Sequence, residues 1–136
     1  RGSRQHLKIM QLLAAVEGDG ATPLVETIVM SASRIRRGMT AIVVTPSLDT
    51  SWVRPIGALR ARGIGCVAVL LDAGAFDHRD REERARLAGH PPYHADAEVE
   101  AARARRARAL QHALAEFEIR TFAVGPDRAL GEVLVG

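Results

Sequence analysis

The sequence is poor in aromatic residues and cysteine, and each shortage narrows what the chain can be. Aromatic residues make up 4% of the 136 residues, whereas hydrophobic residues make up 47%, so the core must be built from aliphatic side chains. The one cysteine, Cys66, has no partner for an internal disulfide and lies in an apolar run, which indicates a small buried hydrophobic residue. A disulfide-stapled fold is excluded, and a reducing compartment is favoured.

Lysine is also scarce, and Lys8 is the one lysine among the 19 lysine and arginine residues. The 16 acidic residues leave a net charge of only +3, so arginine content rather than a basic surface raises the isoelectric point. We therefore expect no nucleic-acid partner.

Long apolar runs are missing as well. None approaches the roughly 20 residues that a membrane-spanning helix needs, and no signal peptide is visible. Because the sequence does not begin with methionine, we expect a piece of a longer protein, and membrane segments only outside this chain.

Residues 39–49 form the stretch around which the rest is organised. Ile42, Val43 and Val44 are apolar without alternation, which predicts a central strand covered on both faces, as in a parallel sheet. Pro46 has no N–H for a ladder, so the chain should leave the sheet there through a polar turn at the carboxyl end of the strand. Ligands and partners of open α/β sheets tend to meet the protein at that end.

Apolar strands alternate with amphipathic helices along the chain, a pattern typical of βαβ units. We expect strands at 41–45, 64–72 and 119–124, and helices at 5–17, 23–37, 51–62, 80–87, 98–117 and 128–134. The first of these helices should be well covered. We therefore predict a single α/β domain over residues 1–136. It should have a three-layer α/β/α arrangement with a parallel, Rossmann-like sheet. Because the sheet has only about three strands, we expect a partial domain.

Polar residues follow the predicted strands and open one helix, and these are the candidate site residues: Thr22, Thr45, Ser47, Asp49, Asp72 and Asp127. Three aspartates that follow three parallel strands could share one edge of the sheet. Aspartate at such turns is also what helix capping selects, and we weigh capping as the simpler interpretation. Thr22, directly before Pro23, has the pattern of a helix cap.

Two further groups carry possible chemistry. His90 and His94 have metal-like spacing near His78, but two prolines lie between them and no cysteine is near, so no zinc site is expected. Arginines crowd residues 103–108, where a solvated helix face is the simpler interpretation than a phosphate site. No phosphate-binding glycine motif and no nucleophile elbow are present, and no cofactor is expected.

Several segments together resemble a known family. These are residues 20–24 opening a helix, the strand and turn at 41–45, and residues 59–64, 67–72 and 117–127. They are similar to the carboxyl-terminal half of a von Willebrand factor A-like domain, as found in bacterial uncharacterised proteins associated with MoxR-type AAA ATPases. The resemblance covers most of the chain and depends on pattern more than on rare motifs.

The resemblance implies a role in binding or assembly, with no catalysis, and membrane segments ahead of the domain. Metal-binding members hold Mg²⁺ with an Asp-x-Ser-x-Ser loop, a threonine and a later aspartate. Thr22 stands at the position of the threonine, but the loop is missing and Pro46 stands where the aspartate would be. Asp49 lies three residues further on. The implied metal-ion-dependent adhesion site is therefore degenerate, and Thr22 and Asp49 are only weak candidates for metal ligands.

Two functional hypotheses follow. The leading one is a non-enzymatic protein-interaction module in the cytoplasm, whose partner is a MoxR-type AAA ATPase or a second copy bound through the unpaired edge of the strand at 41–45. That edge could also be covered by the first helix or by swapped elements. The alternative is a small-molecule-binding or hydrolytic domain that uses Asp49, Asp72 and Asp127.

Overall fold

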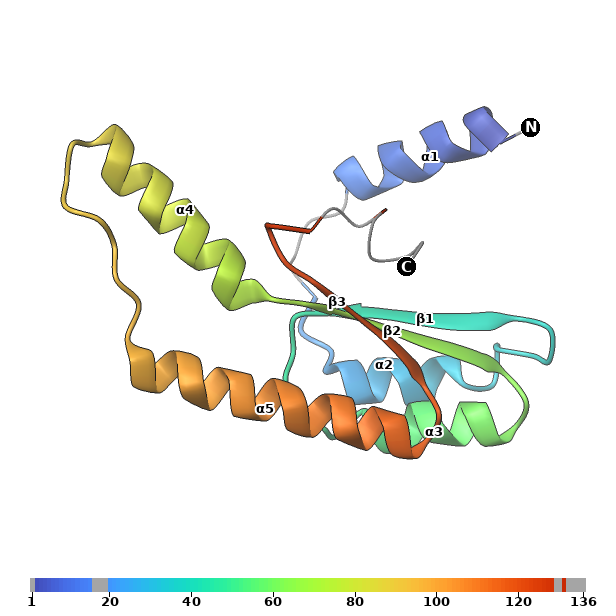
Figure 1. Cartoon of the computed structure of the whole chain (residues 1–136). Helices are drawn as coiled ribbons and strands as arrows, with labels where there is room; N and C mark the ends of the chain where they lie inside the picture. Colours follow the sequence, from blue (N-terminus) through green and yellow to red (C-terminus); the bar gives the residue numbers. More distant parts are fainter. Residues whose placement is uncertain (1, 16–19, 129–130, 132–136) are drawn as a thin grey trace.

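The computed structural model describes residues 2–15, 20–128 and 131. The elements follow one another in the order α1 (Gly2–Ala15), α2 (Leu24–Ser31), β1 (Thr40–Thr45), α3 (Val53–Ala61), β2 (Gly65–Leu71), α4 (Ala73–Leu87), α5 (Ala97–Glu116) and β3 (Arg120–Val124). Figure 1 shows the arrangement.

The three strands form one parallel sheet in the order β1-β2-β3. Ile42 pairs with Val67, and Val69 lies between Val44 on one side and Phe122 on the other. The predicted α/β class and parallel sheet are confirmed. Both β1 and β3 have one side that pairs with no other strand among the described residues.

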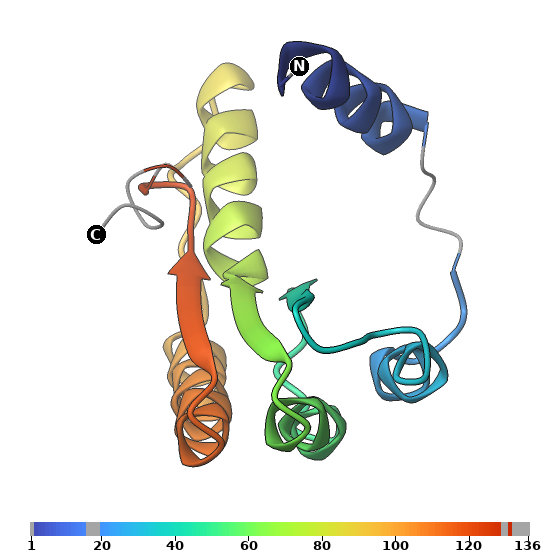
Figure 2. The same cartoon turned by 90° about the vertical axis from the view of Figure 1, so that its right-hand side faces the viewer.

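Helices α2, α3 and α5 pack on one face of this sheet, below the strands in Figures 1 and 2. The side chains between them form the core and include Trp52, Ile56, Leu59, Ile64, Cys66, Ala68, Leu110 and Leu114. The prediction that Cys66 is buried is confirmed. Val99, which the sequence pattern placed inward on α5, is 53% exposed because the core contacts only the second half of that helix, whereas Phe117, at the end of the helix, is 37% exposed.

Along β1, no described segment of the chain covers the opposite face of the sheet. Ile42 and Val44 are 62% and 59% exposed, whereas Ala41 and Val43 pack against the core. The prediction of a strand buried on both faces was therefore wrong for β1. An apolar run without alternation does not reveal which face has a neighbour, because that depends on the rest of the fold.

Helix α1 was predicted to be well covered, and this was wrong, because it buries none of its residues. In Figure 1 it lies on the side of the sheet away from α2, α3 and α5. The end of the predicted helix, at 16–17, lies outside the described residues.

Two other helices differ in length from the prediction. Helix α2 ends at Ser31 rather than near Arg37, and Arg62 donates hydrogen bonds to the freed carbonyls of Ala32 and Ile35 at 3.0 and 3.5 Å. Helix α4 begins at Ala73 rather than at residue 80. It is polar on all sides, so it lacks the apolar period by which helices are recognised. The predicted helix at 128–134 lies almost wholly outside the described residues.

Candidate functional site

The turn after β1 is held by a chain of local hydrogen bonds. The backbone N–H of Ser47 donates to Oγ1 of the buried Thr45 at 3.0 Å, and the N–H of Asp49 donates to Oγ of Ser47 at 3.2 Å. Asp49 in turn accepts hydrogen bonds from the N–H and the hydroxyl of Ser51. The side chains of three candidate residues therefore shape the turn itself.

Asp49 is fully exposed to solvent in this turn. The hydroxyl of Ser51, and then its N–H, hold the pKa of the Asp49 carboxyl below its ordinary value of 3.8. Asp49 is thus ionised at neutral pH and is already engaged with Ser51. This supports the interpretation of Asp49 as a turn residue.

Asp72 ends β2 and caps helix α4. Its Oδ1 accepts a hydrogen bond from the N–H of Ala75 at 3.0 Å, which confirms the capping prediction for this residue. The buried Gly74 follows, and a Cβ at that position would lie 1.5 Å from Nη1 of Arg103. Arg103 of α5 therefore crosses directly over the first turn of α4.

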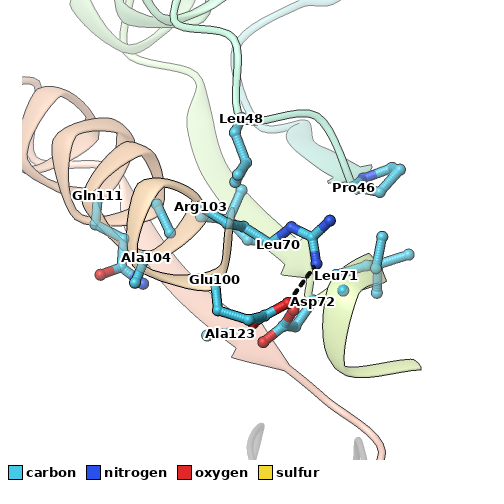
Figure 3. A pocket seen from close by; sticks show the side chains of 13 residues that line it. Pro46, Leu48, Leu70, Leu71, Asp72, Glu100, Arg103, Ala104, Gln111 and Ala123 are labelled. Atoms are coloured by element: carbon cyan, nitrogen blue, oxygen red, sulfur yellow. Dashed lines mark hydrogen bonds and ion pairs between the residues drawn. The ribbon is translucent and has the colours of Figure 1, made fainter. Parts of the chain in front are cut away.

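A cavity of about 220 Å³ opens beside Asp72, between the carboxyl end of the sheet and α5. Figure 3 shows Pro46, Leu48 and Leu70 on its walls, with Glu100 and Arg103 at its polar side. Nη1 of Arg103 lies 3.3 Å from Oε1 of Glu100, so the two charges pair with each other. The cavity is mainly apolar with one internally paired cation.

The sequence analysis weighed the arginines at 103–108 as a phosphate site and favoured a solvated helix face, and it did not place Glu100, Arg103 or Gln111 on a cavity. These residues lie on α5 among many similar charged residues, so no local pattern separates them from their neighbours. Gly74 was the available signal, because a glycine inside a helix often permits a close approach.

Asp127 lies apart from this cavity, beside a second and more polar one. Its Oδ1 is 4.0 Å from Nη1 of Arg79, which also donates a hydrogen bond to the carbonyl of Pro126 at 2.7 Å. His78 lines the same region, and its ring lies 5.3 Å from the ring of Tyr93. Of the three aspartates, Asp72 lines the first cavity, Asp127 lines the second, and Asp49 lines neither.

Thr22 does not have the predicted role of a helix cap. Helix α2 is preceded by Pro23, and no side chain caps it. The hydroxyl of Thr27, within the helix, instead donates to the Pro23 carbonyl at 3.2 Å. Thr22 is exposed and lies outside both cavities.

The residues of the implied metal site do not fit a magnesium ion. The oxygens of Asp49 are occupied by Ser51, and Pro46 offers no ligand. Over residues 2–15, 20–128 and 131, no three His, Cys, Asp or Glu side chains come close enough together to hold a metal ion. No step of the function is therefore assigned to a metal.

The free edge of β1 forms a different kind of candidate site. A groove of about 310 Å³ runs beside this edge on the helix-covered face. Its walls are almost wholly apolar and come from α2, the segment that follows α2, β1 and α3: Leu24, Thr27, Ile28, Ser31, Ile35, Ala41, Ile42, Val43, Val44, Ile56 and Leu59. Figure 2 shows α2 below the sheet and beyond the edge of β1. The strand thus has unpaired backbone groups beside an apolar groove, and its Ile42 and Val44 are exposed.

Comparisons with protein-family models, with curated proteins and with solved structures gave no match. In the described part of the chain, no helix has both the length and the apolar character to cross a membrane.

Proposed function

We propose that this chain is a non-enzymatic protein-interaction module that binds an extended segment of another protein at the free edge of β1. The proposal retains the family suggested by the sequence, a von Willebrand A-like domain of a MoxR-associated bacterial protein, with a degenerate metal site. It places the module in the cytoplasm, as part of a protein whose membrane segments, where present, lie outside this chain.

The edge of β1 carries the proposal. An unpaired strand offers a row of N–H and C=O groups that a second strand can satisfy, and such strand addition is a common mode of peptide recognition. Side chains of an added strand point alternately to the two faces. One set would enter the groove beside Ala41 and Val43, and the other would lie beside Ile42 and Val44. The segment that fits is therefore apolar at most positions.

A second copy of this chain is one source of such a strand. Two β1 strands related by a twofold axis would pair antiparallel, and each copy would then bring its own α2 to the same place below the new pair. Because α2 already lies beyond the edge of β1, the geometry favours a strand that has no helix beside it (Figure 2). This favours an extended segment of a different protein, such as a MoxR-type AAA ATPase.

A defined peptide tests the edge without knowledge of the partner. The probe alternates valine and threonine with a lysine at each end, and the control peptide has proline at alternate positions. We expect the full chain to bind the probe and not the control in fluorescence anisotropy. The variant Ile42→Lys should weaken binding by about tenfold or more, which is about 1.4 kcal/mol. The variant Leu87→Lys, on a distant exposed position of α4, should bind normally.

Equal binding of both peptides, or no effect of Ile42→Lys, would remove the basis of the proposal. Sedimentation velocity of the wild-type chain tests the second copy directly. A dimer that Ile42→Lys dissociates would identify this chain as its own partner.

One observation favours a second function, the binding of a small molecule in the cavity beside Asp72. The pair of Glu100 and Arg103 gives this cavity a polar side within apolar walls. Screening a fragment library by ligand-observed NMR, with Arg103→Gln as the comparison, tests it. A fragment that binds the wild type and not this variant would favour the second function over strand addition.

A further inference from the structure

Two apolar surfaces of this chain lie on the same side of the sheet, and neither is covered by another of the described residues. One is the uncovered face of the sheet, and the other is helix α1, which buries none of its residues. Helices of this length are only marginally stable alone in water, so α1 needs a surface to pack on.

Four large apolar residues of α1, Ile9, Met10, Leu12 and Leu13, gather on one side of the helix. Ile9, Leu12 and Leu13 follow the i, i+3, i+4 spacing that places side chains on one stripe, and Met10 lies next to them. Leu12 and Leu13 are 68% and 63% exposed. Arg4 and Gln11 lie on the opposite side of the helix, together with the exposed Leu7, and Lys8 flanks the stripe one turn before Leu12. This is the pattern of a helix that covers an apolar surface with one face in water.

The uncovered face of the sheet is apolar across all three strands. The register places Ile42 beside Val67, Val44 beside Val69, and Val69 beside Phe122, so these side chains share one face. The guanidinium of Arg120 lies 5.0 Å from the centre of the Phe122 ring and marks the charged limit of the face at β3. The most exposed part is the side at β1.

The connection between α1 and α2 is long enough to bring the two surfaces together. Residues 16–23 join the helices, and eight residues span at most roughly 26–29 Å. Neighbouring layers of secondary structure pack about 10 Å apart, so helices on opposite faces of a sheet lie about 20 Å apart. In Figure 1, α1 already lies on the uncovered side.

We propose that α1 is a lid that packs its stripe of Ile9, Leu12 and Leu13 onto the uncovered face of its own sheet. The lid completes the third layer and shields Ile42 and Val44 from water. It leaves the backbone edge of β1 free, so this inference does not depend on strand addition and goes beyond it.

Cross-linking in the full chain tests the lid. With Cys66 replaced by alanine, one variant carries Leu13→Cys and Val44→Cys, and the matched control carries Gln11→Cys and Val44→Cys. A tethered helix that does not dock has the same millimolar effective concentration in both variants. A docked lid brings residue 13 onto the sheet and turns residue 11 away from it. With a short bis-maleimide, we expect the first variant to form the intrachain link about tenfold faster than the control, a ratio that corresponds to about 1.4 kcal/mol.

Equal rates in the two variants would overturn the proposal, and so would links between two chains, since these would show that a second copy covers the face.

A second measurement does not depend on cysteine variants. The pair Leu12→Glu and Leu13→Glu should increase binding of a fluorescent apolar dye relative to wild type, whereas Arg4→Glu and Gln11→Glu should leave it unchanged. An unchanged signal in the first pair would count against the lid. Peptide binding at the edge can succeed or fail independently of both readouts.

Discussion

Val44 and Val69 are register partners on the same face of the sheet, yet Val44 is 59% exposed and Val69 only 7%. The difference arises because Val69 has a strand on each side, whereas Val44 has a neighbour only at β2. The same kind of side chain is thus core on one strand and accessible surface on the next. This contrast is the physical basis for treating β1 as a docking edge.

The core below the sheet should dominate stability. Leu114 is completely buried between α5 and the sheet, so Leu114→Ala is expected to lower the free energy of unfolding by about 2–5 kcal/mol. Leu87, 74% exposed on α4, is the matched control, and Leu87→Ala should change the free energy of unfolding by less than about 0.5 kcal/mol. Urea unfolding followed by circular dichroism measures both. Similar losses at the two positions would contradict the assigned core.

The close approach of α3 and the end of α5 depends on a glycine. A Cβ at Gly57 would lie 2.4 Å from Cδ1 of Phe117, so Gly57→Ala should cost about 1–3 kcal/mol of unfolding free energy. In a Phe117→Ala background the ring is gone, and the same change should be neutral or stabilising because alanine favours a helix over glycine. A double-mutant cycle of urea unfolding free energies measures the coupling. Additive effects would show that the two residues do not meet.

The capping role of Asp72 predicts a loss of stability that a neutral cap can rescue. Asp72→Ala should lower the unfolding free energy by about 0.5–2 kcal/mol, because the N–H of Ala75 loses its acceptor. Asp72→Asn keeps a side-chain oxygen that can accept this hydrogen bond, so this variant should retain most of the unfolding free energy. If asparagine were as damaging as alanine in thermal unfolding, the carboxylate charge rather than the cap would be what the site needs.

Asp49 should make a small contribution to the pH dependence of stability. Because Ser51 lowers the pKa of this carboxyl in the folded chain, Asp49 stabilises the fold at pH values above 3.8, and this contribution is lost as the pH falls through the lowered pKa. The variant Ser51→Ala removes the hydroxyl and should raise the pKa of Asp49. An NMR titration of the carboxyl carbon measures the shift. An unchanged titration would mean that the hydroxyl does not hold this carboxylate.

Much of the fold could be predicted because each strand and most helices carry a local signal. The run from Cys66 to Leu71 predicts a buried strand, and the period of Trp52, Ile56 and Leu59 predicts the inward face of α3. Helix α4 was largely missed because its stability depends on a cap and on exposed ion pairs such as Arg81 with Asp77, which leave no apolar period.

The candidate site was harder to predict for a different reason. Capping by Asp72 follows from local sequence, whereas the position of Asp127 beside Arg79 depends on how β3 and α4 meet in space. The exposure of Ile42 depends on what lies over the sheet, and no pattern within β1 contains that information.

Amide hydrogen exchange along β1 tests the docking edge most directly. The alternating valine–threonine peptide is added to the full chain, and exchange is followed by NMR for Thr40–Thr45 and, as an internal control, for the other outer strand, Arg120–Val124. Strand addition at β1 predicts that exchange slows in Thr40–Thr45 and is unchanged in Arg120–Val124. Unchanged exchange in β1 at a saturating peptide concentration, or equal slowing in both outer strands, would contradict it.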